Sequence, residues 1–156
     1  MNPNLMEQLQ QITPEEQKLL ARNSGVEKEL YTSSREFVID SGKMLKQGKL
    51  IAVRPHTRFA DFPAHRHNYV EVMYVCRGSI THVIDGVTVT MNEGDLLFLN
   101  QQIRHEVKAA SLYDIGINLI ILPEFFEQPA FLTGADTPLT GFLVELLRRK
   151  KGRGQF

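Results

Sequence analysis

The sequence predicts a mainly β protein, an antiparallel β-barrel or jelly roll, with short helices before the barrel and one helix after it. Short segments rich in β-branched and aromatic residues follow one another from residue 49 to residue 122, with tight turns between them. No helical pattern separates these segments, so neighbouring strands are expected to pair antiparallel. The Asp85-Gly86 pair between two such segments is a strong hairpin signal, because both residues tolerate a positive φ.

Two short helices are expected at residues 4–11 and 14–22, covering one end of the barrel. Thr13 is a suitable cap, Pro14 suits the first helical position, and a glutamate follows where it can complete a capping box. The apolar stripes of these helices are too short for a coiled-coil partner. Ser41 is expected to cap a third short helix that ends near Gly48.

The barrel strands are expected at residues 49–54, 70–77, 80–84, 87–91, 96–99, 105–109 and 112–122, with a loop through Pro63 between the first two. A helical turn at Pro123 and an amphipathic helix after Thr137-Pro138 follow. The chain therefore divides into an N-terminal helical segment, the barrel and a C-terminal helical segment, at residues 1–48, 49–122 and 123–156.

Composition narrows the class of protein. The 156 residues suit one domain, and 18 basic residues against 18 acidic ones give no global field that would attract nucleic acid. The single cysteine, Cys76, excludes an intramolecular disulfide, fits a reducing compartment and is expected to be a buried, inert thiol. No apolar run reaches the roughly 18 residues of a membrane span, and the N-terminus is no signal peptide. A cytoplasmic, soluble protein is expected.

A candidate site begins at His65 and His67, whose side chains share one face of an extended segment because strand side chains alternate. An unbroken strand keeps Glu71 on that face, and His105 arrives from a later strand. Three imidazoles and a carboxylate that converge can hold Zn, Fe, Mn or Ni. The alternative is a hydrogen-bonded polar cluster occupied by water or ligand. The two other histidines, His56 and His82, are expected at the surface or in packing.

This pattern resembles the motifs of the cupin barrels. His65, His67, Glu71 and Gly78 match the first cupin motif, and the second is matched by Gly94, Asp95 and His105. Two positions depart from it: Phe59 stands where a glycine is expected, and residues 100–102 replace the Pro-X-Gly turn. The resemblance implies a cupin-type antiparallel β-barrel, the double-stranded β-helix or jelly roll. Cupin barrels of transcription regulators often keep some of these residues without an ion, so no cofactor is certain and a divalent transition metal is the candidate.

Residues 30–147, above all 65–126, resemble the sensor domain of AraC-family bacterial transcription regulators, through the runs GDLLFLN and LPEFF. In that family the cupin binds a small effector and mediates dimerisation, and a separate C-terminal pair of helix-turn-helix units binds DNA. That half, on the order of 100 residues, is absent here, so DNA binding is expected only through a missing domain. Residues 152–156 are interpreted as the start of a further element; a stand-alone cupin is the alternative. The homodimer seam is expected at Phe142, Leu143, Leu146 and Leu147.

The favoured function is effector binding without catalysis. The alternating strand places Met73 beside Glu71 on the inner face, and Arg54-Pro55 resembles an Arg-Pro pair beside the sugar pocket in that family. The expected ligand is a sugar or another small polar molecule, held by Arg54, His65, His67, Glu71, Met73 and His105. The alternative is a small metalloenzyme, a dioxygenase or isomerase that uses the three histidines and Glu71. It is less favoured because no further residue is an obvious general acid or base. A dimerisation module with a collapsed interior is a third interpretation.

Overall fold

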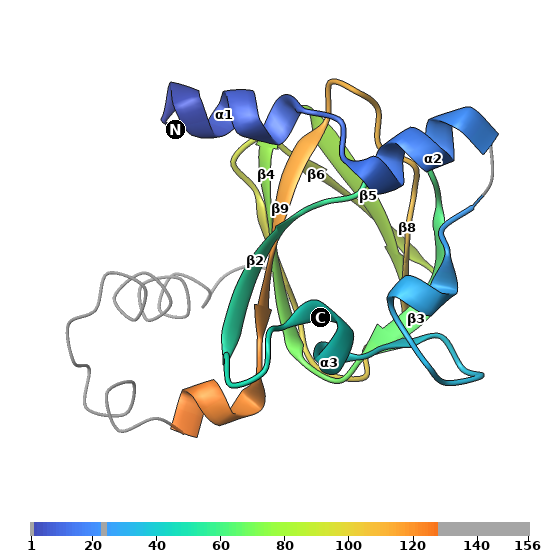
Figure 1. The fold of residues 1–156 in the computed structure, drawn as a ribbon, viewed down its shortest axis with the longest axis vertical. Helices are drawn as coiled ribbons and strands as arrows, with labels where there is room; N and C mark the ends of the chain where they lie inside the picture. Colours follow the sequence, from blue (N-terminus) through green and yellow to red (C-terminus); the bar gives the residue numbers. More distant parts are fainter. Residues whose placement is uncertain (1, 23–24, 128–156) are drawn as a thin grey trace.

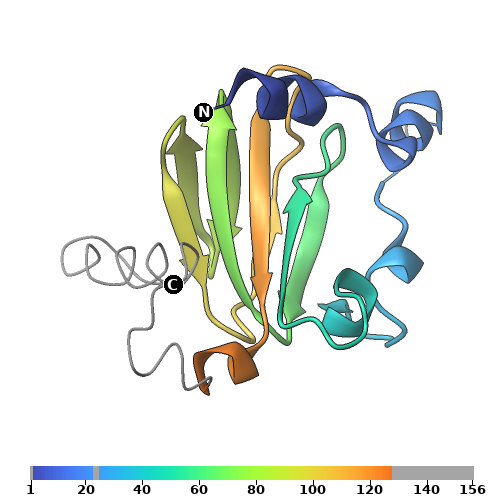
Figure 2. The same ribbon diagram turned by 60° about the vertical axis from the view of Figure 1, so that its left-hand side comes forward.

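Two β-sheets face each other and enclose the core in the computed structural model, which describes residues 2–22 and 25–127 (Figures 1 and 2). The larger sheet has five strands in the order β1-β3-β8-β5-β6, and the smaller has four in the order β2-β9-β4-β7. In this part of the chain every strand pair is antiparallel except β1–β3. The antiparallel β architecture predicted from the sequence is therefore confirmed.

Most strands agree with the predicted segments within two residues. Their bounds are β1 Val38–Ile39, β2 Ile51–Pro55, β3 Phe62–His67, β4 Val70–Arg77, β5 Ser79–Ile84, β6 Val87–Asn92, β7 Leu96–Leu99, β8 His105–Val107 and β9 Ile115–Ile121.

Three differences concern strand ends and a missed strand. β1 was not predicted, and β3 already begins at Phe62, where a loop through Pro63 was expected. The prediction that the last strand starts at residue 112 is wrong. Asp114 accepts hydrogen bonds from the backbone N–H groups of Ser111 and Ser79, both at 2.8 Å, and so closes a turn before β9.

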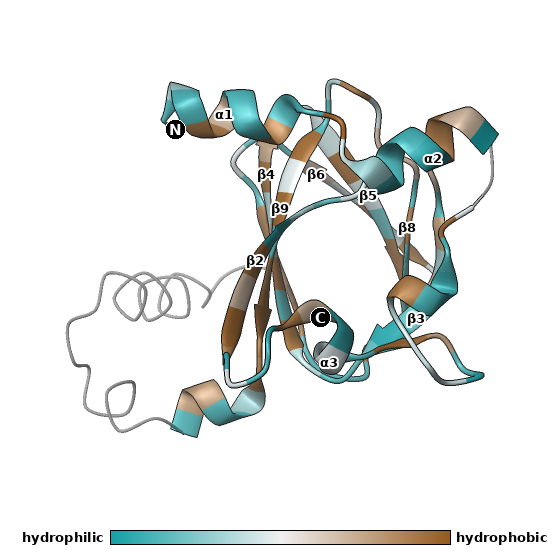
Figure 3. Cartoon of the chain, in the orientation of Figure 1, coloured by the Kyte–Doolittle hydropathy of each residue, from teal (hydrophilic) through white to brown (hydrophobic). Residues whose placement is uncertain are grey.

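The helices are α1 (Pro3–Gln10), α2 (Pro14–Arg22) and α3 (Ser41–Met44), with 3₁₀ turns η1 (Lys28–Leu30) and η2 (Pro123–Glu127). α1 and α2 lie at one end of the barrel, and both are mostly hydrophilic (Figures 1 and 3).

The capping box of α2 is confirmed. The hydroxyl of Thr13 accepts from the N–H of Glu16 at 3.2 Å, and the carboxylate of Glu16 accepts from the N–H of Thr13 at 3.0 Å. The cap predicted for α3 is wrong: the carboxylate of Asp40 caps it by accepting from the N–H of Gly42 at 2.9 Å. The N–H of Ser41 donates to Asn68 Oδ1 at 2.8 Å instead, and α3 ends at Met44 rather than near Gly48.

The main apolar core lies between the sheets, and a second cluster around Val72, Leu119 and Ile121 lies on the opposite face of the smaller sheet. Cys76 is buried, and its burial raises the pKa of the thiol, which fits the inert thiol expected. Among the described residues no helix has both the length and the apolar character needed to cross a membrane. The predicted C-terminal helix with Phe142, Leu143, Leu146 and Leu147 lies outside the described residues.

Candidate ligand and metal site in the barrel interior

All five histidines of the chain are buried, none more than 6% exposed. Of the two alternatives expected for His56 and His82, a surface position or a place in packing, the structure shows the second. His82 lies between Ile80 and Ile84 on β5, where residues alternate between buried and half-buried. His56 follows β2, and its N–H donates to the carbonyl of Gly116 on β9 at 2.9 Å, which holds it beside the sheet.

The larger sheet brings four of the histidines together. His65 on β3 pairs with His105 on β8, and their ring centroids lie 4.2 Å apart. His67, two residues after His65, shares its face as expected and lies 5.3 Å from His105 between ring centroids. His82 lies 5.7 Å from the His105 ring. The interior therefore contains a contiguous group of imidazoles.

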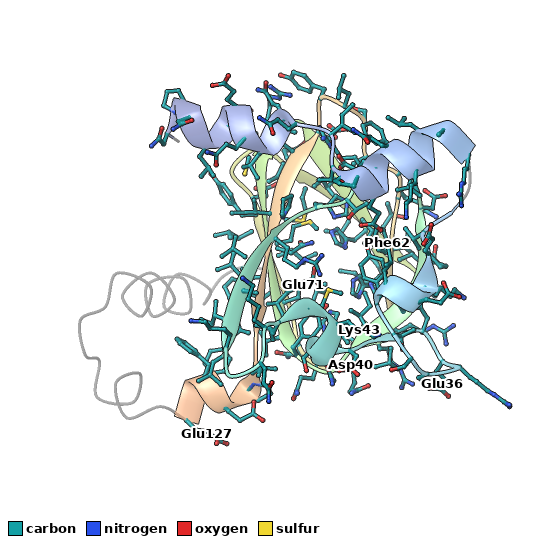
Figure 4. All side chains as sticks on the ribbon, in the orientation of Figure 1. Glu36, Asp40, Lys43, Phe62, Glu71 and Glu127 are labelled. Atoms are coloured by element: carbon teal, nitrogen blue, oxygen red, sulfur yellow. The ribbon has the colours of Figure 1, made fainter. Side chains whose placement is uncertain are left out.

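Glu71 reaches this group from the smaller sheet. The unbroken strand expected between His67 and Glu71 does not occur, because the chain bends at Asn68 and Tyr69 and passes from one sheet to the other. The side chain of Glu71 nonetheless points into the interior between the sheets (Figure 4). Its Oε2 lies 3.1 Å from Nε2 of His67.

Three of the four predicted ligands form a group that could hold a metal ion. The ligand atoms of His67, Glu71 and His105 all lie within 4.8 Å of one another, whereas His65 falls outside this group. The Nδ1 atom of His67 donates to the carbonyl of Tyr69 at 2.8 Å, and that of His105 donates to the carbonyl of Ile103 at 3.4 Å. In the neutral rings the lone pair therefore belongs to Nε2, as a metal ligand requires.

The charges of this group also fit a metal. Burial lowers the pKa of His105 to about 3 and that of His82 to about 4, so both rings are neutral at pH 7. Burial alone would raise the pKa of the Glu71 carboxyl, but its contact with His67 holds that pKa far below its ordinary value. Nε2 of His105 has no hydrogen-bond partner among the described residues. Two imidazole nitrogens and one carboxylate suit Zn, Fe, Mn or Ni.

A cavity adjoins these residues. It offers about 60 Å³ to water-sized molecules, room for one compact ligand, since a buried water takes about 10–15 Å³ on this scale. Of the predicted pocket residues, His67 lies outside the lining; the five that line the cavity are Arg54, His65, Glu71, Met73 and His105.

Sequence reasoning missed several lining residues, among them Tyr31, His56, Tyr69 and Asn118. Asn118 is opposite Arg54 on β2 and Met73 on β4, and this register is not readable from the sequence. One signal was available: Asn118 is a lone polar residue in the apolar run of β9.

At both positions that depart from the cupin motifs, the backbone adopts a conformation typical of glycine. Phe59 has a φ of 75° and Gln102 has a φ of 66°, both in the left-handed region that favours glycine. Gln102, the last residue of the altered turn before His105, thus has a glycine-like conformation, and His105 is buried.

Comparison with protein families supports the same fold. The sequence profile of the Cupin domain matches residues 50–113. The fold is a cupin. Two solved structures to which the chain is similar, the EutQ protein of Clostridium difficile and KdgF from Halomonas sp., have TM-scores of 0.39 at 22% and 15% identity. They cover 46% and 54% of this chain, and 55% and 91% of their own chains.

The chain is also similar to part of a curated regulator. The HTH-type transcriptional activator RhaS of Escherichia coli K12 is 31% identical over 87 residues, which cover 54% of this chain. The same segment spans 29% of RhaS, and RhaS of Shigella boydii matches equally. The chain therefore aligns with less than a third of these relatives.

Proposed function

We propose that this cupin is the effector-binding sensor domain of an AraC-type transcription regulator, and that it binds a small polar molecule without transforming it. The observation that carries the proposal is the cavity, which is lined by the charged or polar side chains of Arg54, His56, Glu71 and Asn118. The partial similarity to the activator RhaS supports a regulatory setting. In this proposal the sensor works in the cytoplasm as a homodimer through Phe142, Leu143, Leu146 and Leu147, which lie outside the described residues, and DNA is bound by a separate domain.

The acidity of the cavity residues supports binding rather than proton-transfer catalysis. A general acid or base works best with a pKa near the working pH. Burial lowers the pKa of His56 to about 4 and that of His105 to about 3, while burial together with the charge of Glu71 raises that of Tyr69 well above its ordinary value. None of these groups is poised to exchange a proton near pH 7.

The proposal is tested by thermal unfolding with a panel of aldoses, polyols and carboxylic acids of two to six carbons. We expect at least one compound to raise Tm, because a ligand at about 100 times its Kd stabilises by roughly 2.7 kcal/mol. Asn118→Leu should abolish this shift, whereas Thr81→Val, on the strand face that is not buried, should keep it. A full-length regulator whose DNA affinity ignored every bound compound would contradict the proposal.

A metalloenzyme is the second candidate, and the buried group of His67, Glu71 and His105 favours it. A bound metal there would supply Lewis-acid activation of a substrate oxygen or of water. Elemental analysis should then find one metal per chain, lost in His67→Ala and Glu71→Gln and retained in His82→Gln, together with turnover that disappears with the metal. Stoichiometric metal without turnover on the same panel would leave the sensor as the better proposal.

A further inference from the structure

We propose that the ligand of the cavity is a small hydroxy acid whose carboxylate binds Arg54. This inference rests on the proposed effector-binding function and names the chemical class of the effector.

Among the described residues, Arg54 has no anionic partner. Among the described residues its guanidinium has no carboxylate within ion-pair distance, and its hydrogen-bond contact is Sδ of Met44 at 2.7 Å from Nη1. By contrast Arg58 is paired with Glu16, and Arg66 is paired with Glu36. A thioether is a weak acceptor, and the guanidinium carries five N–H donors in a fork that matches a carboxylate. A ligand carboxylate would supply the missing partner.

The position of Arg54 directs this cation into the cavity. Arg54 on β2 pairs with Asn118 on β9, and Asn118 pairs with Met73 on β4, so the three residues form one cross-strand row. All three line the cavity, and Met73 is buried in the core between the sheets. The row therefore lies on the inner face of the smaller sheet, and a ligand in the cavity meets Arg54 there.

Two buried polar atoms beside Arg54 indicate hydroxyl groups on the same ligand. Oδ1 of Asn118 and Nε2 of His56 have no hydrogen-bond partner among the described residues, and both residues line the cavity. Buried polar atoms are rarely left unpaired. The amide oxygen is an acceptor, so it needs a donor that a carboxylate cannot supply and a hydroxyl can.

Glu71 gives the ligand an orientation. It lies on β4 two residues before Met73, and so about 7 Å further along the inner face. Its carboxylate contacts His67 at 3.1 Å and would repel a second carboxylate placed beside it. The cavity is thus positive at Arg54 and negative at Glu71, so an acid group binds at the Arg54 end. A neutral sugar of the same shape would leave the guanidinium unpaired.

The experiment compares matched ligands by titration calorimetry on the purified chain. D-glucuronate and D-glucose differ in a carboxylate against a CH₂OH group, and lactate and propane-1,2-diol form the same contrast in a smaller size. We expect the acid of at least one pair to bind about tenfold tighter or more. In Arg54→Met this preference should fall to about twofold or less, whereas the matched variant Arg66→Met should keep it, because Arg66 does not line the cavity.

Each of the other possible results contradicts a stated part of the proposal. If the neutral compound of each pair binds equally or more tightly, the inference that the ligand is a hydroxy acid is wrong, while the proposed effector-binding function is unaffected. Equal competition by inorganic phosphate also overturns that inference, because the site would then bind any anion. If the folded Arg54→Met variant still binds the acid more tightly than the neutral compound, Arg54 does not bind the carboxylate. If Arg54→Met does not fold, wild-type affinity for glucuronate must weaken with added NaCl while that for glucose does not, or the proposal is wrong. Absence of binding and of stabilisation by every compound contradicts the proposed function itself.

Discussion

Two residues without glycine's freedom, Phe59 and Gln102, hold left-handed backbone conformations in the turns that lead to the histidine strands. The N–H of Gln102 donates to the carbonyl of His67 at 3.0 Å, so this turn ties the chain before β8 to the end of β3. That hydrogen bond helps to set the position of His105, at the start of β8, relative to His67. The conformation is therefore imposed by the pairing around it, at a cost of roughly 1–2 kcal/mol for a residue with a Cβ.

Gln102→Gly should accordingly stabilise the protein by about 0.5–1 kcal/mol, because glycine adopts a positive φ without steric cost. The side chain of Gln102 is exposed, so little packing is lost. Urea unfolding measures the effect. Gln102→Ala is the control and should remain near wild type, since it keeps the Cβ; equal stability of the alanine and glycine variants would show that the turn carries no strain.

At the scale of elements, one buried ion pair fastens the N-terminal helices to the barrel. Arg58 lies in the loop before β3, is 2% exposed, and donates from Nε to Oε1 of Glu16 at 2.8 Å and from Nη2 to Oε2 at 2.9 Å. Arg58 also donates to the carbonyl of Gln11 at 3.0 Å. Burial alone would raise the pKa of Glu16, but the hydrogen bonds from Arg58 and Thr13 hold it below its ordinary value.

Arg58→Met should destabilise the protein by about 3–5 kcal/mol, because it leaves the Glu16 carboxylate buried without a partner. The double variant Glu16→Leu/Arg58→Met should recover much of that loss, since both charges are then removed. Arg66→Met breaks the exposed pair with Glu36 and should cost less than about 1 kcal/mol. Urea unfolding of the three variants gives the comparison, and equal losses for Arg58→Met and Arg66→Met would refute the role of the buried pair.

Elements with local signals could be predicted from the sequence, and elements that depend on distant partners could not. Asp85 and Gly86, with φ of 49° and 81°, form the turn that their own chemistry favours, and the strands beside them follow. β1 has two residues and exists because Val38 and Ile39 pair in parallel with Arg66 and His67, far along the chain. No pattern within so short a segment indicates that pairing.

The same division applies to the site. Strand alternation and motif spacing placed His65, His67 and His105 together, whereas the entry of Glu71 from the other sheet was not foreseen. Asn118 reaches the cavity through the register of three strands, which only the folded sheet defines. Gly116 packs beside this site: a Cβ there would lie 2.5 Å from Cδ1 of Ile80, the end of a side chain, and at an ordinary contact distance of 3.5 Å from Cβ of His56.

At the scale of the whole molecule, the interior contains buried polar side chains whose desolvation lowers the stability of the fold. His67, His82 and His105 are among the largest fully buried side chains, alongside Met73 and Leu99. Replacing such rings by apolar residues of similar size would relieve the desolvation of their nitrogen atoms. Their presence is better explained by a ligand or metal in the interior than by the needs of folding.

The metal-free protein should therefore lose stability as pH falls from about 6.5 toward 4. Burial lowers the pKa values of His56 and His82 to about 4 and that of His105 to about 3, from an ordinary 6.5, so in this window protons bind the unfolded chain preferentially. Each histidine contributes a slope of up to about 1.4 kcal/mol per pH unit. The slope of the unfolding free energy against pH is measured by urea unfolding between pH 7.5 and pH 4.5, in steps on the order of one pH unit. His82→Gln should reduce the slope by one histidine's share and Thr81→Val should not; a flat profile would mean that these imidazoles protonate without unfolding.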